Sequence, residues 1–251
     1  MQTILVALAA GFAVSLVANV ATTVYLHRTL AHRALTLNPA INQVFRALTW
    51  VTTGIRPRQW VAVHRKHHAY TDVEGDPHSP VLNGWIKVQM MNVAMYRREA
   101  KNPATIARYA KDIPQTTADR LFYDHALFGL ALGVGALVLV FGPAVGLLAA
   151  LVHVNLYLGG SAAVNAVGHH FGRRPYDNTA GNLQWLALIT AGEGLHNNHH
   201  AAPTSAKLAH RWFEIDPGWY VIKALTWVRL ARVRLSDLRL TRAARARPEA
   251  A

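Results

Sequence analysis

The sequence of 251 residues contains no cysteine. This absence excludes disulfide bonds, thiolate metal sites and catalysis by a cysteine nucleophile. Charged residues are also scarce, at 16% of the chain against roughly 25% in soluble domains. Apolar residues make up 52%, and only 13 Asp and Glu stand against 26 Lys and Arg. The low charge content, the shortage of acidic residues and the apolar runs predict an integral membrane protein.

The excess of positive charge is not typical of a nucleic-acid-binding protein. Basic residues of such proteins lie on a mostly polar surface, where they alternate with aromatic residues. Here they lie between long apolar runs: residues 56–120 hold eleven Lys or Arg and residues 207–247 hold ten. Lys and Arg accumulate in cytoplasmic loops of membrane proteins. Both regions are therefore expected on the cytoplasmic side, and nucleic acid is not expected as a partner.

Three apolar runs are candidates to cross a bilayer, which requires about 20 helical residues. They cover residues 4–26, 121–141 and 144–168, and Gly142-Pro143 predicts a turn between the last two. The first run lacks a basic flank and is longer than the apolar part of a signal peptide, so we expect a retained helix. The pattern predicts a single all-α membrane domain over residues 1–251. The predicted domain has three transmembrane helices, with the N-terminus outside and the C-terminus inside.

Two further segments are amphipathic and are expected to lie along the membrane surface. Residues 38–63 are half apolar but carry Arg46, Arg56 and Arg58. An Arg near the centre of a spanning helix costs roughly 2.5–3.5 kcal/mol, so we expect one interfacial helix there. Residues 217–247 mix apolar side chains with many Arg. This tail predicts an interfacial helix against anionic lipid, and a solvated basic tail is the alternative.

Fourteen histidines are the feature that most needs an explanation. Eight of them fall into three clusters, namely His27 with His32, His64 with His67 and His68, and His196 with His199 and His200. Residues three and four apart share a helix face, so each H-x-x-H-H triplet can point its rings in one direction. A single triplet could be a solvated helix end. Two triplets of the same spacing, together with a pair, predict more than one metal ion, because neutral imidazole is the commonest metal ligand.

The types of donor narrow the class of metal site. There is no H-E-x-x-H motif of a zinc hydrolase. Only one Glu-x-x-His motif is present, Glu193 to His196, whereas the carboxylate di-iron bundles use two. His169 follows Asn165 by four residues at the inner end of the third predicted span, so both side chains can face one side of a helix. An Asn side chain can hold a metal-bound water by a hydrogen bond. The clusters fall at the cytoplasmic ends of the spans, which predicts a histidine-rich cytoplasmic cap.

The histidine clusters and their flanking residues resemble the three histidine boxes of membrane fatty acid desaturases. The branch that they resemble most is the stearoyl-CoA (Δ9) desaturase-like one. The matching motifs are His27-Arg-x-x-x-His32, His64-Arg-x-His67-His68, Gly192-Glu-Gly-x-His196-Asn-x-His199-His200, Asn165-x-x-x-His169-x-Phe-Gly-x-Arg-Pro-Tyr-Asp177 and Asp76-Pro-His78. The resemblance runs from about Leu26 to Pro203. Members of this branch usually have a hairpin of two helices before the first box, and this chain has room for one helix. Either the hairpin is shortened in this protein, or the given sequence starts downstream of the true start.

The resemblance implies an O₂-dependent desaturase that uses two iron ions to insert a cis double bond, at Δ9, into a saturated acyl chain. The implied iron ligands are His27, His32, His64, His67, His68, His169, His196, His199 and His200, and Asn165 binds one iron through water. The chain has no haem-binding or Fe–S motif, so we expect an external electron donor such as a ferredoxin or a cytochrome b5-like protein. The acyl carrier is left open between coenzyme A, acyl carrier protein and a lipid. A multi-pass protein of a bacterial inner membrane, with a cytoplasmic active site, is expected.

Other residues are candidates for supporting roles. Trp60, in helical spacing with His64, is a candidate to line the substrate channel, with aromatic packing as the alternative. His78 and Glu193 are candidates to orient metal ligands; the alternatives are a turn histidine and a turn cap. Arg97, Arg98 and Lys101 are interpreted as solvated loop charges, with binding of a substrate headgroup as the alternative.

Two other functions are alternatives to the desaturase. The nearest is a related membrane di-iron hydroxylase, which the histidine boxes alone separate poorly; the Gly192-Glu-Gly and Arg174-Pro-Tyr-Asp177 contexts favour the desaturase. The other is a metal transporter, whose ligands would lie near the middle of the membrane. The histidines here gather at one end of the predicted spans, which argues against transport.

Overall fold

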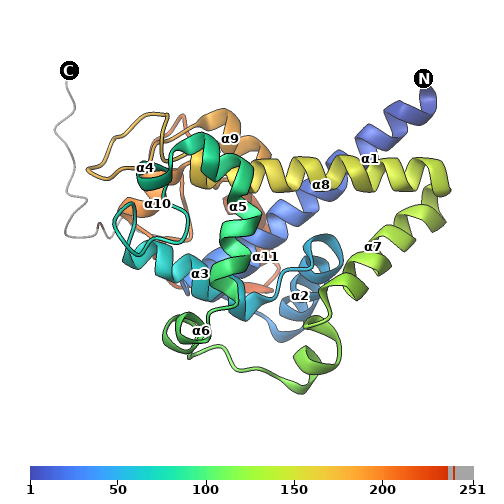
Figure 1. Cartoon of the computed structure of the whole chain (residues 1–251), viewed down its shortest axis with the longest axis horizontal. Coiled ribbons are helices and arrows are strands. Elements are labelled where there is room, and N and C mark those ends of the chain that lie inside the picture. The colour runs from blue at the N-terminus through green and yellow to red at the C-terminus, as the bar shows by residue number, and fades with distance from the viewer. Residues whose placement is uncertain (237–239, 241–251) are drawn as a thin grey trace.

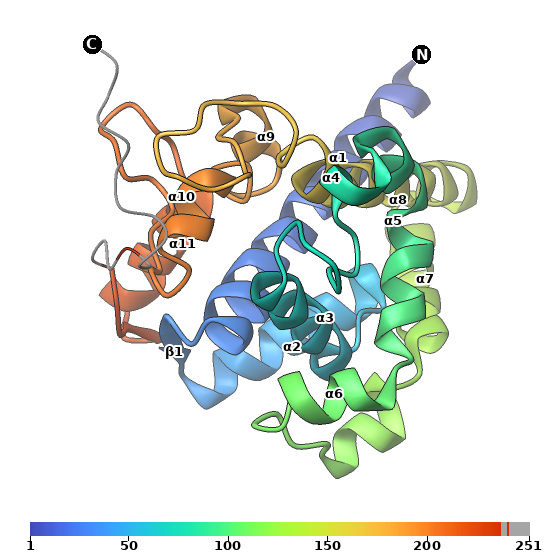
Figure 2. The same cartoon turned by 60° about the vertical axis from the view of Figure 1, so that its left-hand side comes forward.

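Helices make up most of the molecule, as Figures 1 and 2 show from two directions. The computed structural model describes residues 1–236 and residue 240. In chain order the elements are α1 (Gln2–Ala21), the π-helical η1 (Thr22–Ala31), β1 (Leu35–Leu37), α2 (Pro39–Thr53), α3 (Pro57–Ala69), α4 (Pro80–Asn83), α5 (Trp85–Ala100), α6 (Pro103–Tyr109), the π-helical η2 (Asp119–Tyr123), α7 (Ala126–Phe141), α8 (Pro143–Ala166), α9 (Gln184–Ile189), α10 (His196–Ala201), α11 (Pro217–Trp227) and β2 (Ala231–Val233). The predicted all-α class is confirmed in its main part, and the short β1–β2 pair is the exception.

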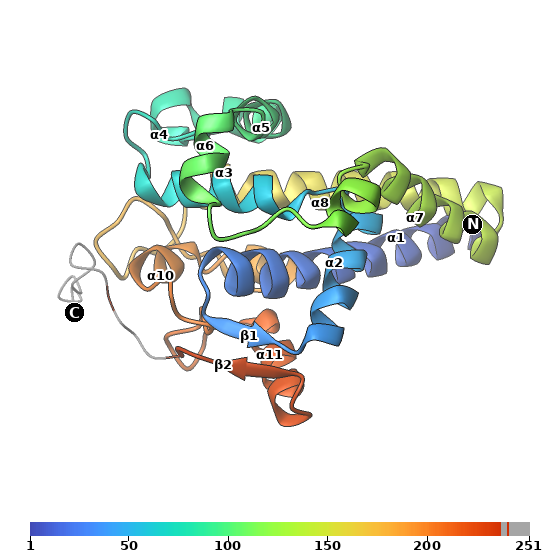
Figure 3. The same ribbon diagram turned by 90° about the horizontal axis from the view of Figure 1, so that it is seen from below.

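The helices α1, α7 and α8 form the apolar end of the molecule, where Figure 3 shows them extending side by side. Among the described residues, two helical stretches are long and apolar enough to cross a membrane, Gln2–Ala31 and Pro143–Ala166, and α7 is a shorter apolar helix of 16 residues. Only 33% and 28% of the residues in the most apolar parts of the two long stretches are buried. Most of their apolar side chains therefore point outward, as expected of helices that are surrounded by lipid.

Small residues and one buried histidine hold the apolar helices together. Gly11 of α1 lies directly against α8, where an added Cβ would come within 2.6 Å of the Ala149 carbonyl oxygen. Such close backbone approach is typical of helix pairs in membranes. The His153 ring on α8 lies 3.0 Å from the Ser15 hydroxyl of α1, and its Nε2–H donates to the Thr52 carbonyl of α2 at 2.8 Å. One imidazole thus links three helices.

A buried ion pair joins the inner end of the first long helix to the C-terminal part of the chain. The guanidinium of Arg28 in η1 donates to both carboxylate oxygens of Asp216, at 2.8 and 2.9 Å, and both side chains are 1% exposed. Arg28 also donates to the carbonyls of Ala206 and Ala191. Asp216 in turn accepts from the Trp219 backbone N–H at the start of α11. Removing one partner of such a buried pair costs about 3–5 kcal/mol, so this contact fixes the position of α11 against η1.

The structure corrects several of the boundaries predicted from the sequence. The single amphipathic helix predicted over residues 38–63 is wrong, because α2 ends at Thr53 and α3 begins at Pro57. Gly54 adopts a left-handed conformation (φ +64°) that ends α2, and the fixed φ of Pro57 favours the first position of a new helix. The first span is longer than predicted, since α1 continues into η1 as far as Ala31.

The later predicted segments also differ in their ends. The second span does not extend to residue 121, because η2 is a separate turn and His125, with ψ 72°, interrupts the helix before Ala126. The third span ends at Ala166, so Gly168 and His169 lie in the following turn. The helix predicted over residues 217–247 ends at Trp227, and Ala231–Val233 pairs with β1 instead. The last part of that prediction, residues 237–239 and 241–247, lies outside the described residues.

Candidate metal centre

The π-helical turn η1 explains how the first histidine pair can share one side of a helix. His27 and His32 are five residues apart, which in an α-helix would point their side chains well away from each other. A π-helix has i→i+5 hydrogen bonds, and the His32 N–H donates to the His27 carbonyl at 3.0 Å. Five residues are then close to one turn, and the two rings lie 4.8 Å apart.

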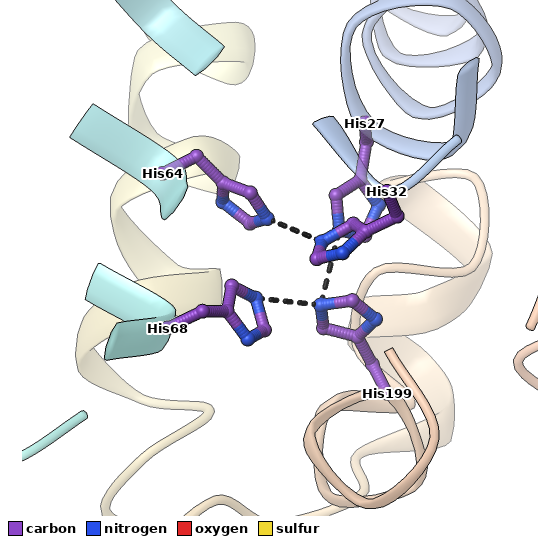
Figure 4. Close-up of side chains that lie close together, drawn as sticks. All are labelled: His27, His32, His64, His68 and His199. Atoms are coloured by element: carbon purple, nitrogen blue, oxygen red, sulfur yellow. Dashed lines mark hydrogen bonds between the residues drawn. The ribbon is translucent and has the colours of Figure 1, made fainter. Parts of the chain in front are cut away.

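Five imidazoles form a first group, which Figure 4 shows converging from η1, α3 and α10. One ligand nitrogen from each of them lies within 4.8 Å of all the others, and the members are His27, His32, His64, His68 and His199. The Nε2–Nε2 distances are 2.8 Å between His32 and His64, 2.9 Å between His68 and His199, and 3.1 Å between His27 and His199. With metal–nitrogen bonds of about 2.1 Å, neighbouring ligands of an octahedral ion lie about 3 Å apart and opposite ones about 4 Å apart. The spacing fits one metal ion.

Four imidazoles form a second group next to the first, and its members are His67, His169, His196 and His200. Their ligand nitrogens also lie within 4.8 Å of one another, and Nε2 of His196 is 3.2 Å from Nε2 of His200. The His68 ring of the first group stacks on the His200 ring of the second at 4.5 Å. The two groups therefore belong to one continuous cluster, which fits two neighbouring ions.

Carboxylates orient three of these nine rings. The Nδ1 atom of His27 lies 2.7 Å from Glu193, that of His67 lies 3.0 Å from both oxygens of Asp76, and that of His169 lies 2.8 Å from Asp72. A carboxylate that accepts from Nδ1–H fixes the tautomer in which the Nε2 lone pair is free for a metal. Burial opposes ionisation of Asp72, but the hydrogen bonds from His169, Thr179 and Ser79 hold its pKa well below the usual range.

Burial keeps the other six rings in the neutral form that binds metals. The pKa values of His32, His64, His68, His196, His199 and His200 lie well below the usual value of 6.5, first because burial disfavours the charged form and then because neighbouring imidazoles repel it. The Nε2 atoms of His67 and His169 are buried and have no hydrogen-bond partner among the described residues. A buried nitrogen without a partner costs about 1–3 kcal/mol. A bound metal would remove that cost, so the residues fit a metal pair.

A cavity of about 900 Å³ adjoins both groups. His27, His64 and His196 line it on the histidine side, and its other walls come mainly from apolar and aromatic residues of α3, α5, α7 and α8, with a few charged residues among them. This volume lies in the upper part of the range for small-molecule pockets. A long apolar ligand can thus lie next to the metal ligands.

Comparison with known proteins decides the family. The sequence profile of the fatty acid desaturase family, "Fatty acid desaturase", matches residues 3–230. The chain belongs to this family. Its relatives include an "Acyl-CoA C20 Delta5-desaturase" of Anemone leveillei, 33% identical over 84% of this chain and 67% of the relative. The "sn-1 stearoyl-lipid 9-desaturase" of Synechocystis is 32% identical over 82% of this chain and 64% of the relative, and the "Delta-9 acyl-lipid desaturase 2" of Arabidopsis thaliana is 30% identical over 83% and 68%.

Membership in the desaturase family makes the chain an oxidoreductase that acts on fatty acyl chains. The chain spans about two thirds of the length of these relatives. The relatives carry names with different double-bond positions and different acyl carriers, so those two properties need arguments from this chain itself.

The residues predicted to support the ligands lie beside the imidazole groups or line the adjoining cavity. The Trp60 ring stacks on His64, with centroids 4.7 Å apart and planes 12° apart, and it lines the cavity. His78 stacks on His67 at 4.7 Å, and neither of its ring nitrogens has a partner among the described residues. Glu193 accepts from Thr23 as well as His27. Asn165 lines the cavity, and its Nδ2 donates to Asn92 at 3.3 Å.

Sequence reasoning missed other residues of the site. Asp72 received no role, although its carboxylate contacts His169, and Asp76 was noted only as part of a motif. Both lie shortly after the second histidine box, where a carboxylate that orients a metal ligand is a reasonable expectation. Arg97 and Lys101, interpreted as solvated charges, line the cavity, whereas the neighbouring Arg98 does not.

Proposed function

We propose that this desaturase uses two iron ions and O₂ to insert a cis double bond at position 9 of a saturated fatty acyl chain. The observation that supports the proposal most is the pair of imidazole groups beside a large, mostly apolar cavity. The relatives whose names include a 9-desaturase activity support the position of the double bond.

The first iron would be held by His27, His32, His64, His68 and His199. The second would be held by His67, His169, His196 and His200, with Asn165 binding it through a water molecule. Imidazole nitrogen suits iron as well as zinc, copper and nickel, and the desaturase family favours iron among them. A group of four imidazoles would leave room for a water ligand, and Asn165 lines the same cavity as His196 of this group.

When bound, the iron pair supplies with O₂ the oxidising power that breaking an unactivated C–H bond requires, which no side-chain acid or base provides. Overall, two hydrogen atoms leave adjacent methylene groups, and two further electrons and two protons complete the reduction of O₂ to two molecules of water. The chain's own contribution is to position the substrate. Trp60 and the cavity wall hold one pair of carbons next to the ligands, and misplacement by about 1 Å could cost on the order of 100-fold in rate.

The orientation of the desaturase in the membrane follows from its charge. We propose three crossings by the segments around α1, α7 and α8, an outer N-terminus, and a single domain whose histidine-rich cap lies in the cytoplasm. The basic segments 56–120 and 207–247 would then lie on the cytoplasmic side of a bacterial inner membrane, with α11 along its surface. A ferredoxin or a cytochrome b5-like protein would dock on this basic face, since complementary charge steers association.

Expression in a bacterial host that lacks its own desaturase tests the proposal. Extracted lipids should contain a new monounsaturated acyl chain with its double bond at carbon 9, located by mass spectrometry. The His64→Ala variant should yield none, and purified wild-type protein should hold two iron ions per chain. A gain of oxygen in place of a loss of two hydrogens would identify a hydroxylase. Unsaturated product from the His64→Ala variant would defeat the proposal.

A further inference from the structure

The cavity beside the imidazole groups reaches the outer surface of the helix bundle. Four apolar residues line the cavity and are also exposed: Val93 of α5 (41%), Leu127 and Phe128 of α7 (83% and 52%), and Leu158 of α8 (41%). The cavity is partly open to the outside, and a side chain that both lines it and is this exposed lies where the cavity meets the surface. These four side chains therefore form an apolar rim around an opening between α5, α7 and α8.

The apolar rim continues the bilayer-facing surface of the spanning helix α8. Leu147, Leu151, Val154 and Leu158 follow one another at intervals of three and four residues, and each is between 41% and 57% exposed. They form one outward stripe along α8, and Leu158 is its inner end. At about 1.5 Å per residue, Leu158 lies about 22 Å from Pro143, within the roughly 30 Å of a bilayer's hydrocarbon core. Asn165 lies about 33 Å from Pro143, just beyond that core.

The helix α5 borders the opening and crosses α8 rather than running along it, as Figures 1 and 2 show. The Gln89 amide on α5 donates to the Gly159 carbonyl of α8 at 3.1 Å, one residue beyond Leu158. The outer surface of α5 exposes Ile86 (63%) and Met90 (76%). An exposed apolar surface at this depth is unfavourable in water and favourable in the acyl region of a membrane.

The same cavity has a basic edge near its apolar rim. Arg56, Arg97 and Lys101 line it together with the acidic Asp124 and Glu193, and none of the three cationic side chains makes a hydrogen bond or an ion pair with another described residue. Arg97 and Lys101 are exposed. Unpaired cations at the level of the lipid headgroups attract phosphate. The opening is therefore amphipathic, with apolar side chains toward the bilayer and cations next to them.

We propose that the substrate enters through this opening from the cytoplasmic leaflet as the acyl chain of a membrane phospholipid. The phosphate would lie near Arg97 and Lys101, and the acyl chain would pass the rim formed by Val93, Leu127, Phe128 and Leu158. A water-soluble thioester of coenzyme A or acyl carrier protein would approach from the aqueous side, and it would not need an exposed apolar rim at membrane depth. This inference rests on the proposed desaturase function and names the acyl carrier.

A two-label experiment in living cells tests the carrier with the natural electron donor present. Phospholipids of a desaturase-deficient bacterial host are first labelled with deuterated stearate. Unlabelled stearate then replaces it while the desaturase is induced. We expect deuterated monounsaturated chains to accumulate within phospholipids that were made before induction. Unsaturation confined to chains incorporated after induction would overturn the inference and leave the desaturase function intact. If neither pool becomes unsaturated, the proposed function itself fails.

Two pairs of variants test the opening. Val93→Trp fills the rim and should remove most of the conversion of prelabelled phospholipid, while its matched control Val140→Trp, on an exposed part of α7 away from the cavity, should not. Iron content per chain shows that Val93→Trp has folded. Arg97→Gln should lower conversion about fivefold, the effect of one Lys or Arg at an anionic surface, and its neighbour Arg98→Gln should have little effect. If each variant converted prelabelled phospholipid as well as its matched control, the inference would be overturned.

Discussion

The two imidazole groups differ in what holds their rings in place. The first group has five imidazoles, and one carboxylate, Glu193, orients one of them. The second has four imidazoles, and two carboxylates, Asp72 and Asp76, orient two of them. The first group thus has more nitrogen donors, whereas the second has fewer donors but more negative charge directly behind its rings.

This difference indicates that the two metal positions are not equivalent. Carboxylates behind metal-bound imidazoles raise the basicity of the ligands and fix their orientation. In the proposed iron pair, the second position would thus compensate for a missing imidazole and would keep room for a water molecule at Asn165. We expect the groups to respond separately when ligands, carboxylates and pH are changed, as the following predictions state.

The largest effect is expected from removing one ligand of either group. His32→Ala should leave the second group intact and His196→Ala the first, so each purified variant should hold about one iron per chain instead of two, and each should give no unsaturated product. Metal analysis and lipid analysis on the same preparations measure this. His210→Ala is the control, because His210 contacts Tyr176 and belongs to neither group. Loss of both irons from either variant would show that the groups do not bind independently.

A smaller effect is expected from the carboxylates. Asp72→Asn and Glu193→Gln should each lower iron affinity or activity by about 10–100-fold. Asp72→Asn should cost more, because Asp72 accepts from His169, Ser79 and Thr179, whereas Glu193 accepts from His27 and Thr23. The rate of iron loss to a chelator is the measurement. Asp112→Asn, which removes a carboxylate paired with Arg65, serves as the control. A larger loss from Glu193→Gln would reverse the comparison.

The spacing of the histidines allowed the cap to be predicted, but not its division into two groups. Within the triplet on α3, His64 and His68 join the first group while His67 joins the second. Positions i and i+4 share a face more closely than positions i and i+3. A single helix can therefore direct His64 and His68 to one group and His67 to the other. Which group each face meets depends on η1, α10 and the turn after α8, and the local sequence does not contain that information.

The supporting residues were harder to predict because their contacts are distant in the chain. Asp72 and His169 are 97 positions apart, and no periodicity connects them. The break between α2 and α3 was signalled by Gly54 and Pro57, but the amphipathic pattern across them was interpreted as one helix. The strand β2 was missed since its pairing with β1 spans almost the whole chain.

The smallest effect is expected from the pH dependence of the metal-free protein, and it also separates the groups. Burial, the neighbouring His27 and Arg65 all lower the pKa of His32, whereas for His169 the hydrogen bond to Asp72 partly offsets the effect of burial. A histidine with a lowered pKa binds fewer protons when folded than when unfolded. The stabilisation of the native state by neutral histidines is therefore fully present above the ordinary pKa of about 6.5 and is lost as the pH falls below it.

The thermal unfolding temperature of the protein purified with chelator should fall between pH 8 and pH 5, by about 2–4 °C for each kcal/mol lost. His32→Gln should reduce this fall more than His169→Gln. If the two variants reduced it equally, or His169→Gln reduced it more, Asp72 would not distinguish the second group from the first.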